Sequence, residues 1–310
     1  MTLTRSFAVL IGACLAAQNT TPSLNEVPIQ LNVVVTGADG NAIGGLGKNQ
    51  FHVYDDDVQQ QVTLFSVTDE PASVAVIVGN PRRAASAFAA VFLETLRPDD
   101  WRALITYDRH TNILTDFTRN RYKIATTLKD LPPPRFRESQ LYDALYETID
   151  RMDGVEGRKA IVLVSSGLDV GKFSEHPYQE ILKRSLTSET PIYAVSVTHT
   201  EGALSDPAVT GGGMTPTRIR QVDNAMKLFA ENSGGAVFFL KYEEDFQPFS
   251  QTINNQIRYG YTVGFVPADR KKDGKLHKLR LEVGPLDLNH DGKPDKLKVQ
   301  YRHGYNAAVN

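Results

Sequence analysis

The stretch Val74-Ala75-Val76-Ile77-Val78 is a continuous apolar run, without the alternation of a half-buried strand. Such a run is typical of a strand in a parallel sheet that helices cover on both faces. Similar runs follow, separated by segments of helical periodicity, so we predict an α/β fold with a doubly wound, mostly parallel sheet. The later strands are expected at 103–107, 160–165, 192–197 and 236–239, with an antiparallel edge at 112–116, and the helices at 84–96, 121–128, 141–152, 178–188, 221–231 and 244–258.

Strand patterns flank this region on both sides. Residues 27–67 alternate with the period of a strand, and the same pattern returns after Tyr259. We infer that the two β-rich segments pair with each other as a β-sandwich, into which the α/β domain is inserted. The expected division is a signal peptide at 1–19, a β-rich N-terminal segment at 24–70, an α/β domain at 71–258 and a β-rich C-terminal segment at 259–306.

Residues 1–19 have the pattern of an export signal. Arg5 supplies positive charge and an apolar stretch runs from Phe7 to Ala17, too short for a bilayer span of about 20 residues. Ile11-Gly12-Ala13-Cys14 also resembles a lipoprotein box with a lipid anchor at Cys14, but cleavage and secretion are our first choice. No later stretch is apolar enough to span a membrane. The protein is therefore expected to be secreted or periplasmic.

Composition excludes several function classes. Hydrophobic residues make up 41% of the chain, and Lys plus Arg (34) nearly balance Asp plus Glu (36). We expect no nucleic-acid partner, because that binding relies on clustered basic residues. The single cysteine excludes an intramolecular disulfide and every multi-cysteine metal site.

Several segments, in order along the chain, resemble a von Willebrand factor A domain. They are Ser73–Gly79, residues 97–105, Leu141-Tyr142-Asp143-Ala144-Leu145, residues 158–167 and residues 192–197. The flanking segments 46–56 and 301–305 resemble exported A-domain-related proteins that are abundant in Acidobacteria. The resemblance implies a Rossmann-like A-domain fold, but that family has no general biochemical assignment to carry over.

An A domain usually binds its ligand through a metal ion at the top of the sheet. The family pattern is Asp-x-Ser-x-Ser after the first strand, a Thr before the Leu-Tyr-Asp helix and an Asp after the fourth strand. At the matching positions this chain has Gly79, Pro81, Arg83, Ser139 and Ser166. Both carboxylates are missing, whereas Mg²⁺ needs hard oxygen ligands. The resemblance therefore implies a degenerate adhesion site, at which we expect no Mg²⁺.

Two interpretations of the arginines at this site remain open. Arg82 or Arg83 replaces the cation and offers its charge to a carboxylate or phosphate of a partner. Alternatively, constraint on the site has relaxed, and both are solvated surface side chains.

A second candidate ion site lies near the C-terminus. The segment Asp287-Leu288-Asn289-His290-Asp291-Gly292-Lys293-Pro294-Asp295 has the oxygen spacing of a calcium loop. The candidate positions are Asp287, Asn289, Asp291, Lys293 and Asp295. The alternative is a polar turn, rich in these residues for backbone reasons. Elsewhere, Asp55-Asp56-Asp57 is interpreted as a solvated turn, and Asp143 as a helix cap or structural residue.

These features predict a non-enzymatic, exported protein-interaction module. Its partner would be an extracellular or envelope protein, met around Gly79, Pro81, Arg82, Arg83, Ser139 and Ser166. One alternative is a calcium-stabilised structural module without a specific ligand. The other is a hydrolase with an unrecognised site that uses Ser165, Ser166, Asp169 and a distant histidine.

Overall fold

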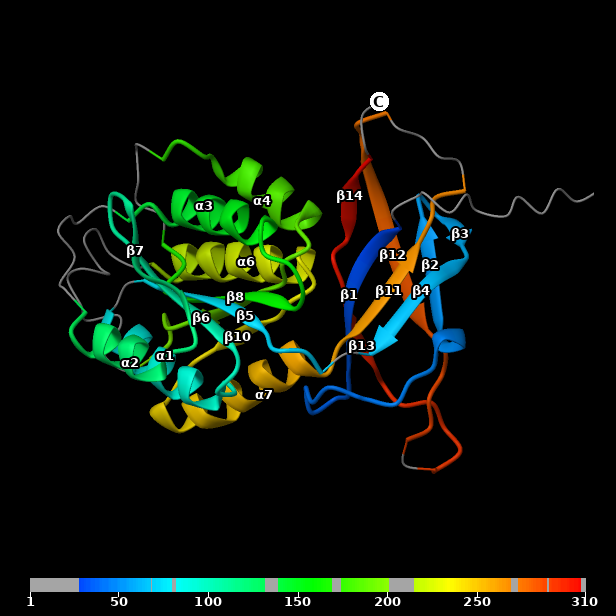
Figure 1. The fold of residues 1–310 in the computed structure, drawn as a ribbon, viewed down its shortest axis with the longest axis horizontal. Coiled ribbons are helices and arrows are strands. Elements are labelled where there is room, and N and C mark those ends of the chain that lie inside the picture. The colour runs from blue at the N-terminus through cyan, green and yellow to red at the C-terminus, as the bar shows by residue number, and fades with distance from the viewer. Residues whose placement is uncertain are drawn as a thin grey trace, which may run out of the picture.

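The structure of the chain is a computed structural model with an α/β part and a β-sandwich part (Figure 1). It describes residues 28–67, 69–79, 82–131, 139–168, 174–200, 215–268, 273–288 and 290–307. The predicted fold class, a doubly wound sheet with a flanking β-sandwich, is confirmed. The predicted signal peptide and Cys14 lie outside the described residues. Within the described residues, none of the helices combines the length and apolar character that crossing a membrane requires.

The α/β part is built on a six-stranded sheet. Its strands are β5 (Ser73–Val78), β6 (Trp101–Tyr107), β7 (Thr111–Thr118), β8 (Lys159–Ser165), β9 (Ile192–Ser196) and β10 (Val237–Phe239). They lie in the order β10-β9-β8-β5-β6-β7. β5 pairs in parallel with both β6 and β8, and β7 is the antiparallel edge strand.

Helices cover both faces of this sheet, as Figure 1 shows. One layer holds α1 (Arg82–Thr95), α2 (Arg121–Lys129) and α7 (Phe246–Arg258), and the other holds α3 (Leu141–Asp153), α4 (Tyr178–Thr187) and α6 (Pro216–Asn232). Along β5, Val74, Val76 and Val78 pack with the first layer, whereas Ala75 and Ile77 pack with the second. Burial on both faces explains the uninterrupted apolar run of this strand.

Three helix starts differ from the sequence prediction. α1 begins at Arg82, two residues before the expected Ala84. α6 begins at Pro216, five residues before the expected Gln221, because the Thr215 hydroxyl accepts the Arg218 N–H (3.2 Å) and proline suits the first helical turn. α7 begins at Phe246 because a 3₁₀ turn, Glu243–Asp245, precedes it.

The sandwich part consists of two four-stranded antiparallel sheets that share one core. Its strands are β1 (Ile29–Thr36), β2 (Phe51–Asp55), β3 (Val58–Gln60), β4 (Val62–Val67), β11 (Tyr261–Phe265), β12 (Leu276–Val283), β13 (Lys298–Gln300) and β14 (Gly304–Asn306), with a short 3₁₀ turn at Lys48–Gln50. The sheet orders are β13-β1-β11-β4 and β14-β12-β2-β3. Both sheets therefore combine strands from before and after the α/β part, and in the first sheet the two kinds alternate.

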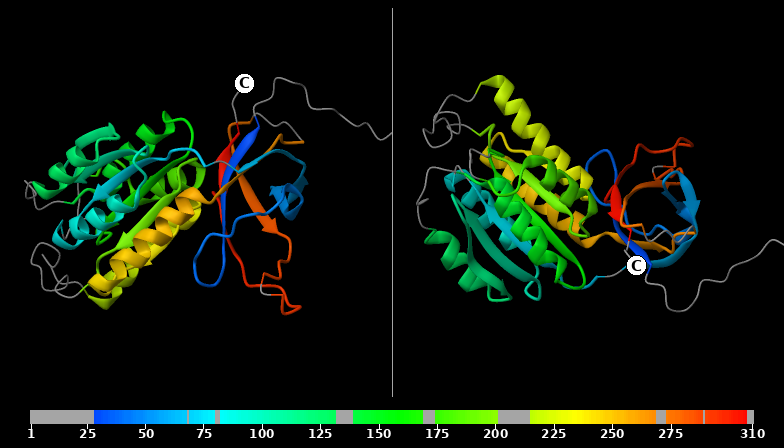
Figure 2. Two further views of the ribbon diagram at one scale, coloured as in Figure 1. Left: turned by 60° about the horizontal axis from the view of Figure 1, so that its bottom comes forward. Right: turned by 90° about the horizontal axis from the view of Figure 1, so that it is seen from above.

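The amino ends of the parallel strands face the sandwich. Both connections between the two parts, from β4 to β5 and from α7 to β11, lie at this edge. Arg302 of the sandwich is buried here and donates to the carbonyls of Thr187 (3.0 Å) and Gln30 (2.7 Å). The carboxyl ends of the strands lie at the opposite end of the α/β part, away from the sandwich (Figures 1 and 2).

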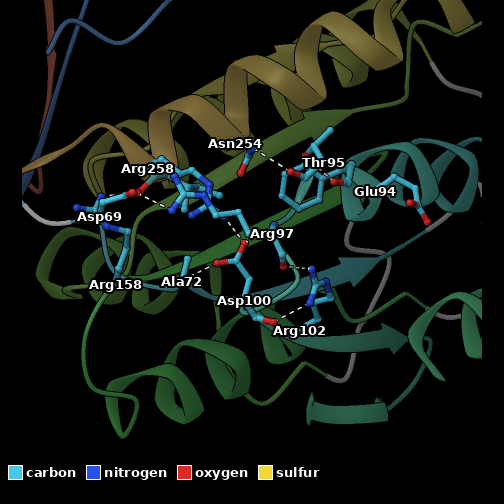
Figure 3. A network of polar contacts seen from close by, with 12 residues as sticks. Asp69, Ala72, Glu94, Thr95, Arg97, Asp100, Arg102, Arg158, Asn254 and Arg258 are labelled. Atoms are coloured by element: carbon cyan, nitrogen blue, oxygen red, sulfur yellow. Dashed lines mark hydrogen bonds and ion pairs between the residues drawn. The ribbon is translucent and has the colours of Figure 1, made fainter. Parts of the chain in front are cut away.

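A buried polar network ties the two connections together (Figure 3). Asp100, which is fully buried before β6, accepts the N–H groups of Ala72 (2.8 Å) and Arg97 (2.7 Å). The same carboxylate pairs with Arg258 at the end of α7. One carboxylate thus joins the segment that enters the sheet to the helix that leaves it.

Candidate functional site

The strand order reverses between β5 and β8, at the centre of the six-stranded sheet. Ligands of doubly wound sheets bind beyond the carboxyl ends of the strands at such a switch point. Gly79 directly follows β5 and Ser166 directly follows β8, so both lie at this position. The switch point is therefore the place at which the A-domain resemblance puts the degenerate adhesion site.

The space beside Gly79 is filled by two hydroxyl groups. The Tyr107 hydroxyl, at the end of β6, lies 2.6 Å from Ser165 Oγ, at the end of β8, and the pair is buried. A Cβ atom on residue 79 would collide with the Tyr107 hydroxyl and would lie 2.7 Å from Ser165 Oγ. A side chain on residue 79 would therefore require these two hydroxyls to shift. Glycine itself supplies no carboxylate at this position.

The two serines of the predicted site lie inside the protein. Ser139 is 5% exposed, and its hydroxyl donates to the Leu168 carbonyl (2.9 Å). Ser166 is 2% exposed, and its carbonyl accepts the Thr198 hydroxyl (3.1 Å). These groups connect the end of β8 to the start of α3 and to the end of β9. They hold the edge together and present no exposed hydroxyl to a partner.

Arg83 is the exposed member of the predicted site. It lies in the first turn of α1, where the positive end of the helix dipole disfavours a cation. Pro81 and the side chain of Arg82 lie outside the described part of the chain. Among the described residues of the site, Arg83 is thus the one whose charged side chain is exposed to solvent.

The same edge holds a histidine–carboxylate pair that the sequence alone does not reveal. His199, which follows β9, lies with Nε2 2.8 Å from Asp223 Oδ2 on α6. The other oxygen of Asp223 accepts the Ser196 hydroxyl (3.2 Å). No sequence motif predicts this pair, because His199 follows a strand and Asp223 lies on a separate helix.

The polar groups that the structure describes at the carboxyl edge do not pair as a nucleophile and its base. Such a pair needs a hydroxyl within hydrogen-bond reach of its base. The Ser165 hydroxyl is completely buried and contacts Tyr107, and it also accepts the Gly167 N–H (3.1 Å). Ser196 and His199 each contact Asp223 instead of each other. Asp169, the acid of the hydrolase alternative, lies outside the described residues.

Asp143 has a structural role in the described contacts. Its carboxylate oxygens accept the N–H groups of Glu175 (3.2 Å) and His176 (2.9 Å) and so fix the segment before α4. The aromatic ring of Tyr146, one turn along α3, stacks on the His176 ring at 3.6 Å.

The candidate calcium loop connects β12 to β13. The two oxygens of Asp287 accept the N–H groups of Asp291 (3.1 Å) and Gly292 (2.9 Å), and Asp295 accepts an N–H from the start of the loop (2.6 Å). Gly292 has a φ of +79°, which favours glycine. Asn289 lies outside the described residues. Lys293 is exposed, and its N–H donates to Asp291 (2.8 Å). Calcium binding and a polar turn both remain predictions.

The segment Asp55-Asp56-Asp57 is not solvated throughout. Asp56 and Asp57 are exposed and form the turn between β2 and β3, with φ values of 45° and 65°. Asp55, in contrast, is 4% exposed and lies beside the buried His277 of β12. One potential metal-ligand atom from each of Asp55, Asp56 and His277 lies within 4.8 Å of the other two. Among the described residues, this is the one group of three or more such side chains that could hold a metal ion.

Comparisons with known proteins give similarity at the level of structure. No family model matches the sequence, and no curated protein matches it. A von Willebrand factor type A structure from Catenulispora acidiphila is 10% identical, covers 94% of this chain and 76% of its own, and has a TM-score of 0.44. The vWF domain of the type V pili tip protein Mfa5 from Porphyromonas gingivalis is 14% identical (62% and 97% covered, TM-score 0.41). An aerotolerance-related membrane protein from Bacteroides fragilis is 13% identical (60% and 98% covered, TM-score 0.46). The fold class of this chain rests on its own strand order and helix layers.

Proposed function

We propose that this chain is a non-enzymatic, exported protein-interaction module that binds its partner at the carboxyl edge of the six-stranded sheet without a metal ion. The observation that carries this proposal is the filled space beside Gly79, where Tyr107 and Ser165 occupy the place of a carboxylate. A divalent cation without a carboxylate ligand is poorly held. Recognition then rests on the protein side chains at this edge.

The exposed charge of Arg83 indicates the chemistry of the partner. A guanidinium presents parallel donors that match a carboxylate or a phosphate, and it keeps its charge at every physiological pH. We assign the partner as an extracellular or envelope protein that carries an acidic group. Arg83 then takes the place of the metal ion that would bind such a group in an A domain with an intact site.

In this proposal the sandwich supports the α/β domain. Residues 24–70 and 259–306 form the sandwich, and it holds the α/β domain, residues 71–258, so that the carboxyl edge is exposed. The pairing of β1 with β11 and of β2 with β12 supports this division. Because both connections lie at the amino edge, the carboxyl edge faces away from the sandwich. Export by the signal at 1–19, with cleavage and without lipidation at Cys14, belongs to the same proposal.

Charge reversal tests the proposed surface. Arg83→Glu is compared with Lys123→Glu, an exposed position in the first turn of α2, at the other end of the helix layer. A photo-crosslinking residue placed at position 86, one turn from Arg83, reports contact with proteins of the producing cell's envelope and medium. We expect a discrete crosslinked partner, lost in Arg83→Glu and retained in Lys123→Glu. Equal crosslinking in both variants would contradict the proposed surface.

A further inference from the structure

Strand pairing brings together three donor side chains at one end of the sandwich. Asp55 ends β2 and pairs in register with Leu279 of β12, close to His277. The turn that follows β2 is left-handed at Asp56 and directs the Asp56 carboxylate back towards His277. His277 is 4% exposed, and its ring stacks against Tyr305 of β14 at 5.2 Å.

The distances at His277 fit the edges of a metal-ligand tetrahedron. Nδ1 of His277 lies 3.1 Å from Asp56 Oδ2 and 3.4 Å from Asp55 Oδ1. Zinc bonds to imidazole nitrogen and carboxylate oxygen are about 2.0–2.2 Å long, so two ligands of a tetrahedral zinc ion stand about 3.3 Å apart. The two distances from Nδ1 thus match those between ligands of such a site, and all three donors lie within 4.8 Å of one another.

A third carboxylate holds the other nitrogen of the ring. Nε2 of His277 lies 3.5 Å from Asp273 Oδ1, in the segment before β12. Metal-bound histidines commonly donate their free N–H to a carboxylate, which orients the ring and raises its basicity. Tyr305 gives similar support to Asp55, because its hydroxyl donates to Asp55 Oδ2 (2.8 Å).

The charge of the cluster favours a divalent cation. Asp55, Asp56 and Asp273 surround one imidazole, so three carboxylates gather at a single nitrogen ring. Lys275 contacts the far side of Asp273 at 3.9 Å. Burying a carboxylate is costly unless opposite charge compensates it. A zinc ion would neutralise Asp55 and Asp56 together.

We propose that Asp55, Asp56 and His277 bind Zn²⁺, with Asp273 as the carboxylate that positions His277. The site pins the β2–β3 turn to β12 and leaves a fourth position for water. It lies in the sandwich and is independent of the carboxyl edge and of the loop at 287–295.

A competition titration against a chromophoric chelator tests this site. The probe is Zn²⁺ alone, added to the untagged full chain that carries Cys14→Ser, so that its single thiol does not compete. We expect one ion per chain and a melting temperature that rises with Zn²⁺, because the ion binds only the folded state. Asp273→Asn should weaken binding about 10- to 100-fold. Asp56→Asn should weaken it at least as much.

Asp57→Asn is the matched control, because Asp57 is the next residue of the same turn but faces Arg280. We expect this variant to bind Zn²⁺ like the parent chain. His277→Gln should abolish binding, and circular dichroism shows whether it folds. The exposed position of Asp56 keeps the test informative if His277→Gln does not fold. The proposal is overturned if the folded parent chain does not bind Zn²⁺, or if Asp56→Asn and Asp57→Asn bind it equally; the cluster is then an ion pair only.

Discussion

The hydroxyl of Tyr107 lies 2.6 Å from the hydroxyl of Ser165, in the space that a side chain on residue 79 would enter. The glycine at position 79 and the Tyr107–Ser165 hydroxyl pair therefore depend on each other, because a larger residue at position 79 would collide with the pair. An aspartate introduced at position 79 would meet the Tyr107 and Ser165 hydroxyls. Under the proposed function, the carboxyl edge works without a metal ion.

This packing predicts the effect of adding a methyl group at position 79. Gly79→Ala should destabilise the protein by about 1–3 kcal/mol, the usual cost of overpacking a buried site. Tyr107→Phe removes the nearest atom, so the double variant should lose less stability than the sum of the single variants. Urea unfolding measures all three. Strict additivity would show that Tyr107 does not fill this space.

Breaking the buried ion pair between Asp100 and Arg258, at the junction of the two parts, should strongly reduce the stability of the protein. Asp100→Asn leaves the Arg258 guanidinium buried without its counter-charge, and breaking such a pair costs about 3–5 kcal/mol. Glu94→Gln, which breaks the exposed pair with Arg121, should cost less than about 1 kcal/mol. Chemical denaturation compares the two. Similar small losses would mean that Asp100 does not hold the junction.

We expect Tyr193 to lower the stability of the protein at alkaline pH. Its side chain is fully buried, and burial raises the pKa of the phenol above its ordinary value of about 10, against the opposing influence of nearby Arg158. Below pH 10 the phenol is protonated in both states and contributes no pH dependence. As pH rises above 10, only the unfolded chain releases this proton, so the free energy of unfolding falls.

Tyr193→Phe should reduce that alkaline slope and change stability little at pH 7, because the hydroxyl has no hydrogen-bond partner among the described residues. Denaturant titrations between pH 8 and 11 measure the slope. An unchanged slope in Tyr193→Phe would contradict the assignment.

The loop at 287–295 predicts a weak response to calcium. Millimolar Ca²⁺ should raise the melting temperature of the parent chain, because extracellular calcium loops bind in the range of about 10⁻⁴–10⁻³ M. Asp291→Ala should remove this response, whereas Asp57→Asn should retain it. If Ca²⁺ leaves the melting temperature unchanged, the segment is a polar turn.

Local patterns predicted most of the fold. The apolar run before Gly79 is a strand, and the helix expected from Leu141 begins there, because burial on both faces and helical periodicity are properties of neighbouring residues. The start of α6 was missed because the Thr215 cap lay inside a segment interpreted as a loop. β14 was missed because three residues carry too little pattern.

The sites depended on contacts that sequence spacing does not encode. The glycine at position 79 was recognised as a missing ligand, but Tyr107 was not recognised as its replacement, because the two residues meet across parallel strands. Asp55 was assigned to solvent on the basis of its acidic neighbours. The structure buries it because β2 pairs with β12, which brings His277 over it.

The most direct test of the account is a thermal melt with Mg²⁺ and with EDTA, carried out on the double variant Asp56→Asn/Asp291→Ala. Both other candidate ion sites are disabled in this chain, so a response to Mg²⁺ reports on the carboxyl edge. We predict the same melting temperature in EDTA and in millimolar Mg²⁺, because residue 79 supplies no carboxylate and the Tyr107 and Ser165 hydroxyls occupy the space beside it. A melting temperature that rises with Mg²⁺ would contradict the account and would return a metal ion to the carboxyl edge.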